Sequence, residues 1–306
     1  FAMAFLGGYG NVVARLTPPE VDLYVQHGLR IYHQNAKTGM RFMEGELKTS
    51  ELVIQSLTQE ARLEDIEPLL TKLLRALVGY DVEVGDLGSL DSDELIERGT
   101  HMVCMARWLY LPRRVRHFGH VAQNRNWYRL CGIVAAGMLA ADSFSRIHGH
   151  PAYRTCADLV GSDLVRLNLL QILEYVRVLH TIHVRWPGAR RLLRFGIQTE
   201  LEAQPPSAAA ERLFFDLVYI ILGDTSLGGN LHKPEEATER RCLWEEIINF
   251  VRSSVNVFDT VDLLTPDRVA RAAAAYPGLA TRPLRTFAFL PDFLYPGEVR
   301  RPPNDA

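Results

Sequence analysis

The side chains best suited to chemistry are histidines, which recur in three close pairs: His117 with His120, His148 with His150, and His180 with His183. Two histidines on one helical turn can bind zinc, but no His-Glu-x-x-His motif and no clustered cysteine accompanies them. Asp142 with His148 and His150 is the nearest approach to a catalytic cluster. We therefore predict no catalytic residue, no metal site and no cofactor.

Two glycine-rich segments were considered as phosphate-binding loops. The run Leu6–Val12 resembles a kinase glycine loop, but no Val-Ala-Ile-Lys, His-Arg-Asp or Asp-Phe-Gly follows it, which excludes a kinase catalytic domain. The run Gly223–Asn230 lacks the Gly-Lys-Ser/Thr ending of a phosphate loop. We interpret it as a connection between helices.

The cysteines indicate a reducing compartment. Cys104, Cys131, Cys156 and Cys242 lie far apart and form no Cys-x-x-Cys pair, which is typical of unpaired thiols. The longest nearly apolar run, Gly132–Ala141, has about half of the ~20 residues that span a bilayer. We therefore expect an intracellular protein, cytoplasmic or nuclear, with no membrane span.

Charge is distributed unevenly along the chain. Residues 1–100 carry 9 basic and 16 acidic side chains, residues 101–200 carry 14 and 5, and residues 201–306 carry 11 and 15. All basic residues of the middle third are arginines, whose planar donors suit phosphate and carboxylate. This arginine band is a candidate surface for nucleic acid or for an acidic protein, and the acidic thirds of the chain are a second set of candidate partners.

Helical spacing dominates the hydrophobic pattern. It predicts one helix that starts after Thr17, a second over 46–61, a third that ends at Gly79 and a fourth from Ser92 through Leu109. A long helix is expected from Ser162 to just before Trp186. Three more are expected over 214–221, 243–255 and 265–276. The segment Trp127–Ala141 is apolar or small on nearly every face, which predicts a helix enclosed by others. A short strand is expected only within 81–90. The predicted fold class is all-α.

Composition divides the predicted helices into segments. The run 202–207 contains two prolines and is the best internal boundary. The tail from Thr281 carries five prolines and several aromatic residues, among them Phe287, Phe289, Phe293 and Tyr295, and we expect it to be extended and to pack these rings on the body. We predict four segments: an N-terminal helical part at 1–90, an arginine-rich core at 91–201, a C-terminal lobe at 207–280 and the tail at 281–306.

The order of motifs between Cys104 and Val184 resembles a cyclin box, especially that of phosphate-signalling and Y-type cyclins. Tyr110–Arg113 matches a helix end of the pattern Tyr-Leu-x-Arg, Asn126–Arg129 matches Asn-Trp-x-Arg, and Gly137–Ala141 matches the small residues of the family's central helix. The resemblance implies a five-helix box that regulates a protein kinase. The family's partner-binding Lys is replaced here by Asp142, and Pro112 interrupts the implied helix.

Two functions follow from these patterns. The first is a non-catalytic interaction module, a cyclin-like regulatory subunit or adaptor, that binds another protein such as a kinase through Arg107, Arg113, Arg114, Arg116 and Asp142. The alternative is an arginine-rich helical protein, like a viral nucleoprotein or an RNA-associated protein, that binds nucleic acid through Arg113, Arg114, Arg116, Arg125, Arg190, Arg191 and Arg194. A continuous arginine-lined groove would favour nucleic acid, and a mixed, partly apolar face would favour a protein.

Overall fold

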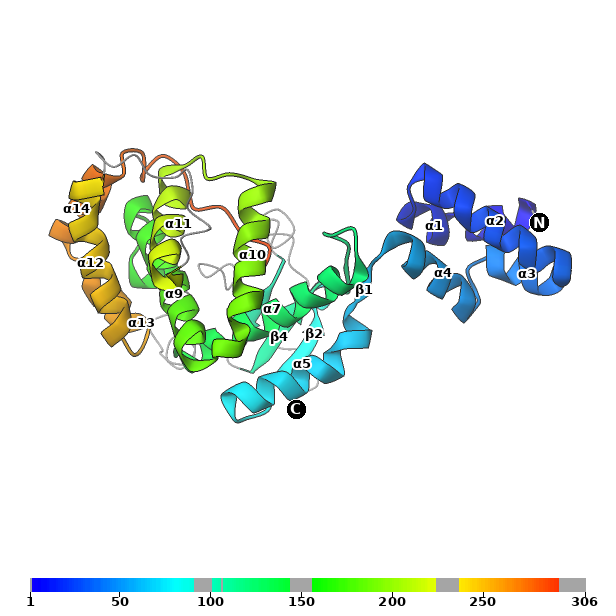
Figure 1. The fold of residues 1–306 in the computed structure, drawn as a ribbon, viewed down its shortest axis with the longest axis horizontal. Helices are drawn as coiled ribbons and strands as arrows, with labels where there is room; N and C mark the ends of the chain where they lie inside the picture. Colours follow the sequence, from blue (N-terminus) through cyan, green and yellow to red (C-terminus); the bar gives the residue numbers. More distant parts are fainter. Residues whose placement is uncertain (1, 91–100, 106, 144–155, 224–236, 292–306) are drawn as a thin grey trace. The chain divides into compact units, whose positions relative to one another are not determined.

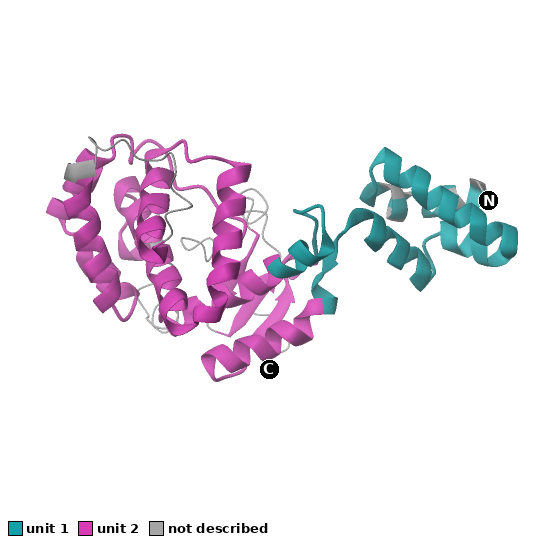
Figure 2. Ribbon diagram, viewed as in Figure 1, with its two compact units in different colours: residues 1–65, 114–126 teal, residues 66–113, 127–306 magenta. Residues whose placement is uncertain are grey.

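The computed structural model describes residues 2–90, 101–105, 107–143, 156–223 and 237–291. These residues are mostly helical with a few short strands, which confirms the all-α fold class (Figure 1). The chain forms two compact units (Figure 2). Unit 1 combines Phe1–Asp65 with Arg114–Asn126, and unit 2 combines Ile66–Arg113 with Trp127–Ala306. In the described part of the chain, no helix has the length and apolar character needed to cross a membrane.

Unit 1 packs its helices around a small apolar core. Its elements are α1 (Ala2–Val12), α2 (Pro18–Gln34), α3 (Ala36–Met43), α4 (Lys48–Thr58) and the strands β1 (Ala61–Arg62) and β5 (Arg114–Val115). Helix α2 begins after Thr17 as predicted, because the Thr17 N–H donates to the Glu20 carboxylate at 2.7 Å. Gly39 lets α3 approach α2, since a Cβ there would lie 2.4 Å from Tyr32 Cα.

A buried asparagine holds residues 114–126 in unit 1. The Asn124 Oδ1 accepts from the backbone N–H groups of His117 at 2.9 Å and Phe118 at 3.0 Å. Its Nδ2 donates to the carbonyls of Gln59 at 2.8 Å and Phe118 at 2.9 Å. Nearby, β5 pairs antiparallel with β1. Because the Asn124 side chain is buried, these four hydrogen bonds satisfy the donors and acceptors of its amide.

Unit 2 holds the remaining elements. They are most of α5 (Leu63–Val78), the strands β2 (Glu83–Asp86), β3 (Val103–Met105) and β4 (Trp108–Leu111), most of α7 (Val121–Ala140), and the helices α9 (Leu164–Arg185), α10 (Arg190–Ala203), α11 (Ala209–Leu222), α12 (Ala237–Ser253), α13 (Val257–Leu263) and α14 (Pro266–Ala275). Helix α9 packs against α10, α11, α12, α13 and α14.

Helix α7 lies in the core of unit 2, as the sequence predicted. From Trp127 to Ala141 nearly every side chain is buried, and Arg129 is the exposed exception. Three neighbouring helices touch it where the side chains are small. A Cβ on Gly137 would lie 2.5 Å from Ile182 of α9, one on Gly132 would lie 3.0 Å from Leu70 of α5, and Gly196 of α10 lies against Leu130 of α7.

The predicted helix that ends at Leu109 is wrong where the structure describes it. Residues 103–105 and 108–111 form β3 and β4, with β4 paired parallel to β2 and antiparallel to β3. The helix end that the cyclin resemblance places at Tyr110–Leu111 is likewise a strand. The apolar spacing fits both structures here, and Trp108–Leu111 is rich in residues that favour strands. Strand β2 confirms the strand expected within 81–90, while residues 91–100 lie outside the described residues.

Several helix ends follow the sequence signals, and others differ. Helix α5 ends before Gly79, whose φ of 87° is readily adopted by glycine. Helix α9 is capped by Asp163 rather than by Ser162, because the Asp163 carboxylate accepts from the N–H groups of Val165 and Arg166. Helix α10 was not predicted. It follows the stop at Trp186–Gly188 directly, and its N-cap residue Ala189 offers no side-chain signal.

The described part of the C-terminal tail is extended and packs on unit 2, as expected. Phe287 and Phe289 are buried, and the Phe287 ring centroid lies 4.7 Å from that of Phe214. Asn168 of α9 binds this segment through the carbonyls of Leu279 and Arg282 and the N–H of Leu284. The other two predicted aromatic residues, Phe293 and Tyr295, lie outside the described residues.

Candidate functional site

The arginines of the predicted binding sets belong to both units. Arg114, Arg116 and Arg125 lie in unit 1. The others lie in unit 2: Arg107, Arg113, Arg190, Arg191 and Arg194. All eight are exposed. The candidate surfaces are therefore described unit by unit.

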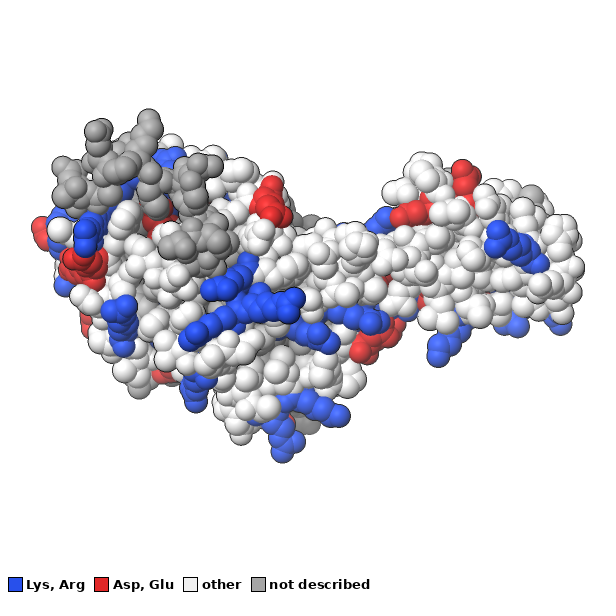
Figure 3. All heavy atoms as spheres, viewed as in Figure 1, with Lys and Arg blue, Asp and Glu red and all other residues white. Residues whose placement is uncertain are grey.

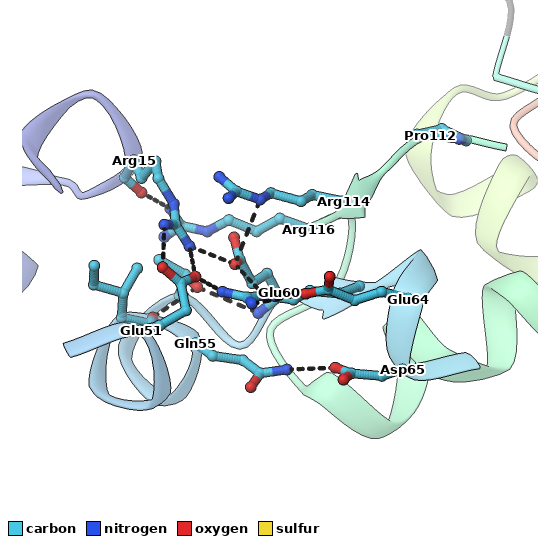
Figure 4. A network of polar contacts seen from close by, with 12 residues as sticks. Arg15, Glu51, Gln55, Glu60, Glu64, Asp65, Pro112, Arg114 and Arg116 are labelled. Carbon is cyan, nitrogen blue, oxygen red and sulfur yellow. Dashed lines mark hydrogen bonds and ion pairs between the residues drawn. The ribbon is translucent and has the colours of Figure 1, made fainter. Parts of the chain in front are cut away.

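In unit 1, two of the predicted arginines bind carboxylates of the acidic N-terminal third. Arg114 Nε lies 4.0 Å from Glu60 Oε1, and Arg116 donates to Glu20 and to the Arg15 carbonyl (Figure 4). The buried Glu60 carboxylate also accepts from Arg15 Nη2 at 2.6 Å. This arrangement matches the expectation that acidic thirds of the chain supply intramolecular partners. It leaves Arg114 and Arg116 less available to an external phosphate.

The same network pairs its carboxylates with arginines. Glu51 and Glu60 both pair with Arg15, and Arg62 pairs with Glu51, Glu60 and Glu64. Arginine stays protonated at any physiological pH and cannot act as a general base. Each of these carboxylates has a guanidinium partner. The network joins the end of α1, α4 and the β1–β5 pair, which is a structural role.

Arg107 and Asp142 of unit 2 both lie within electrostatic range of Tyr80. Both act electrostatically on the hydroxyl of Tyr80, whose pKa is raised mainly by burial, further raised by Asp142 and lowered by Arg107. Asp142 follows α7 with a φ of 54°, a left-handed conformation tolerated by Asp. These two residues of the predicted partner-binding set therefore act on the same hydroxyl with opposite sign.

A group of four arginines lies where α9 ends and α10 begins, and we name it the α9–α10 corner. It comprises Arg185, Arg190, Arg191 and Arg194, within ten residues that contain no acidic side chain. Arg190 Nε donates to the His183 carbonyl at 3.2 Å, which fixes its position. Among the described residues, no carboxylate forms an ion pair with Arg185, Arg190 or Arg191. Figure 3 shows basic side chains gathered over the region where Figure 1 places α10.

Histidine titration reports the positive potential of this corner. The pKa of His183 lies below its usual value because burial disfavours the charged form and because Arg190 and Arg194 repel it. The pKa of His180 is lowered by burial, by Arg252 of α12 and by His183. Helix α10 also has no acidic residue in its first turn, where a negative charge would be favourable. An anionic group would therefore be stabilised at this surface.

The corner is also partly apolar. Val184 is 60 % exposed, and the half-buried Trp186 lies beside Arg185, whose Cζ is 5.8 Å from the ring centroid. Two hollows of unit 2 are lined by α9, α12, α13 and α14, and neither includes a residue of the corner. The corner is thus a mixed surface. The sequence analysis included three of its four arginines but missed Arg185, Val184 and Trp186, although the acid-free run Arg185–Arg194 was a readable signal.

The described cysteines and histidines do not form a reactive or metal-binding centre. No group of three His, Cys, Asp or Glu side chains could hold a metal ion in the part of the chain that the structure describes. His148 and His150 lie outside that part. Burial raises the pKa of Cys104 to about 12 and also raises that of Cys131. A thiol must be deprotonated to act as a nucleophile, so neither suits that role at neutral pH.

The cysteines give a direct test of this burial. We expect iodoacetamide to alkylate Cys242 in the native protein, because Cys242 is exposed, and to leave Cys104 and Cys131 unmodified until urea unfolds the chain. Peptide mapping by mass spectrometry identifies each site. Equal native labelling of Cys104 and Cys242 would contradict the packing of β3.

Comparison with known proteins finds no matching family model, no matching curated protein and no matching solved structure. The cyclin-box resemblance stays a prediction.

Proposed function

We propose that this chain is a non-catalytic interaction module that binds an acidic, partly apolar segment of another protein through the α9–α10 corner. The observation that carries the proposal is a group of exposed arginines, of which Arg185, Arg190 and Arg191 have no carboxylate partner among the described residues. A complementary ligand would supply carboxylates to these guanidinium groups. An intracellular location belongs to the same proposal, and a kinase partner stays an implication of the cyclin-box resemblance.

The apolar part of the corner favours a protein ligand over nucleic acid. Exposed Val184 and half-buried Trp186 offer surface to an apolar side chain, whereas a phosphate backbone would leave Val184 uncovered. Two of the seven arginines proposed for nucleic acid, Arg114 and Arg116, pair with Glu60 and Glu20. These ion pairs would have to compete with phosphate. Nucleic-acid binding is retained as the opposing outcome of the test.

The first test measures binding of an acidic probe. The probe is a fluorescein-labelled peptide in which Glu alternates with Leu, and its affinity for the full chain is read by fluorescence anisotropy. We expect the combined variant Arg190→Gln, Arg191→Gln and Arg194→Gln to bind at least about tenfold more weakly, which corresponds to about 1.4 kcal/mol. The physical reason is the loss of three donors from one surface.

A matched variant controls for net charge. Arg107→Gln, Arg113→Gln and Arg125→Gln remove the same charge from exposed positions outside the corner. We expect this variant to keep the affinity of the wild-type chain within about threefold, because long-range attraction between exposed charges is screened by salt. An equal loss in both variants would show attraction by net charge without a defined site.

Binding at the corner has a signature in the pKa of His183. A bound carboxylate offsets the repulsion from Arg190 and Arg194, so binding raises this lowered pKa and takes up a proton. Affinity is then expected to strengthen as pH falls through the bound-state pKa and to level off below the free-state pKa. NMR of the imidazole measures both values. The variant His183→Gln is expected to lose the part of the pH dependence of affinity that comes from His183. A pKa of His183 that is no higher in the complex than in the free protein would place the ligand elsewhere.

A further inference from the structure

A second mixed surface lies on the α12 side of unit 2. An open hollow of about 650 Å³ is lined by the end of α12, the following turn and α13. Its apolar part includes Phe250 and Val255, and Val255 is 68 % exposed. Its acidic part includes Glu246, Asp259 and Asp262. We name this surface the α12–α13 hollow.

The side chains that line the hollow carry a net negative charge when its ion pairs are taken into account. Glu246 is neutralised by Arg268 and by Arg271, whose Nη1 lies 3.0 Å from its carboxylate. Asp259 accepts from the backbone N–H groups of Val255 at 2.6 Å and Asn256 at 3.0 Å, and it forms no ion pair with a described residue. Asp262 is exposed and forms no ion pair with a described residue. The hollow therefore offers two carboxylates beside an exposed valine.

We propose that the α12–α13 hollow of one chain binds the α9–α10 corner of a second copy of this chain. The corner supplies arginines and Val184, and the hollow supplies carboxylates, Val255 and Phe250, so both charge and apolar surface are complementary. This inference rests on the proposed function, because it names the acidic partner of the corner.

Among the described residues of one chain, the α9–α10 corner does not bind the α12–α13 hollow. Helix α9 contacts α10 as well as α12 and α13, and in Figure 1 it lies between α10 and the α12–α13 pair. No ion pair joins Asp259 or Asp262 to Arg185, Arg190 or Arg191 among the described residues. The contact between copies joins two different faces of the chain, so it is heterologous and each chain keeps one face of each kind available.

Sedimentation velocity of the full chain at low ionic strength tests the proposal, since exposed charges are least screened there. The corner variant carries Arg190→Glu and Arg191→Glu, and the hollow variant carries Asn249→Arg and Asp262→Arg. We expect the wild-type chain to form dimers and larger species as its concentration rises, and each variant alone to be monomeric. An equimolar mixture of the two variants is expected to form a species of two chains, because an intact hollow meets an intact corner.

The control variant carries Asp22→Arg and Gln26→Arg on the exposed face of α2, which changes the charge as the hollow variant does, and it should associate like the wild-type chain. A wild-type chain that stays monomeric, or a mixture of variants that stays monomeric, overturns the self-association. If that chain still binds the acidic peptide through the corner, the proposed function stands and its partner is another protein. If the wild-type chain binds neither a second copy of itself nor the acidic peptide, both proposals fail.

Discussion

Replacing Arg177 by Leu is expected to lower the free energy of unfolding by about 3–5 kcal/mol, because it leaves a buried carboxylate without its cation. Arg177 is 2 % exposed and Glu174 is fully buried in the interior of unit 2. Arg177 Nε donates to Glu174 Oε1 at 2.8 Å, and its Nη1 donates to the carbonyls of Ala141 and Val255. The guanidinium thus joins α9 to the end of α7 and to the turn before α13.

A double variant separates the contribution of the ion pair to stability from that of packing. Glu174 also accepts from Ser143 Oγ at 3.1 Å and from Thr260 Oγ1, so its carboxylate is the centre of the network. We expect Glu174→Leu combined with Arg177→Leu to cost less than the sum of the two single changes, since no unpaired charge remains. Urea unfolding monitored by circular dichroism measures the change in the free energy of unfolding for the two single variants and the double variant. A cost below about 1 kcal/mol for Arg177→Leu would mean that water reaches this pair.

Gly137→Leu is expected to destabilise the protein by about 1–3 kcal/mol through overpacking of α7 against α9. A Cβ at this position would already lie 2.5 and 2.6 Å from two carbons of Ile182 and 3.1 Å from Val178. Both neighbours are buried, so the added side chain has no route to solvent. Thermal unfolding measures the change in melting temperature.

A second glycine provides the matched control. Gly10 of α1 has no atom within 4 Å of its ideal Cβ, whereas Gly137 is enclosed. Alanine favours helix over glycine, so Gly10→Ala should hold or raise the melting temperature while Gly137→Ala lowers it. An unchanged melting temperature for Gly137→Leu would show that α7 is not the packed centre of unit 2.

The elements predicted best are those whose sequence signal is local. An apolar surface on all sides predicted the burial of α7, and the Thr17–Glu20 capping pattern predicted the start of α2. Strand β4 was not predicted because the apolar spacing of residues 102–109 also fits a helix, and its pairing with β2, about 25 residues earlier, leaves no periodic signal in the sequence. The placement of 114–126 in unit 1 depends on Asn124, whose hydrogen bond to the Gln59 carbonyl spans 65 residues.

The candidate site was only partly predictable for the same reason. Composition identified the arginine band, but it did not show which arginines are paired. Arg116 binds Glu20 across 96 positions of sequence, and this contact depends on the fold of unit 1. Helix α10 was missed because Ala189 provides no capping side chain, although buried Leu193, Ile197 and Glu200 follow helical spacing. The α9–α10 corner could therefore be identified only from the structure.

The most direct test of the central claim is a comparison of ligands for the corner at physiological salt. Anisotropy titrations with the acidic peptide, single-stranded RNA and duplex DNA are made with the wild-type chain and with the Arg190→Gln, Arg191→Gln, Arg194→Gln variant. We expect peptide binding that the variant weakens, and no appreciable affinity for either nucleic acid. Submicromolar RNA or DNA binding that falls steeply with added salt and is lost in the variant would contradict it, because the corner would then bind phosphates.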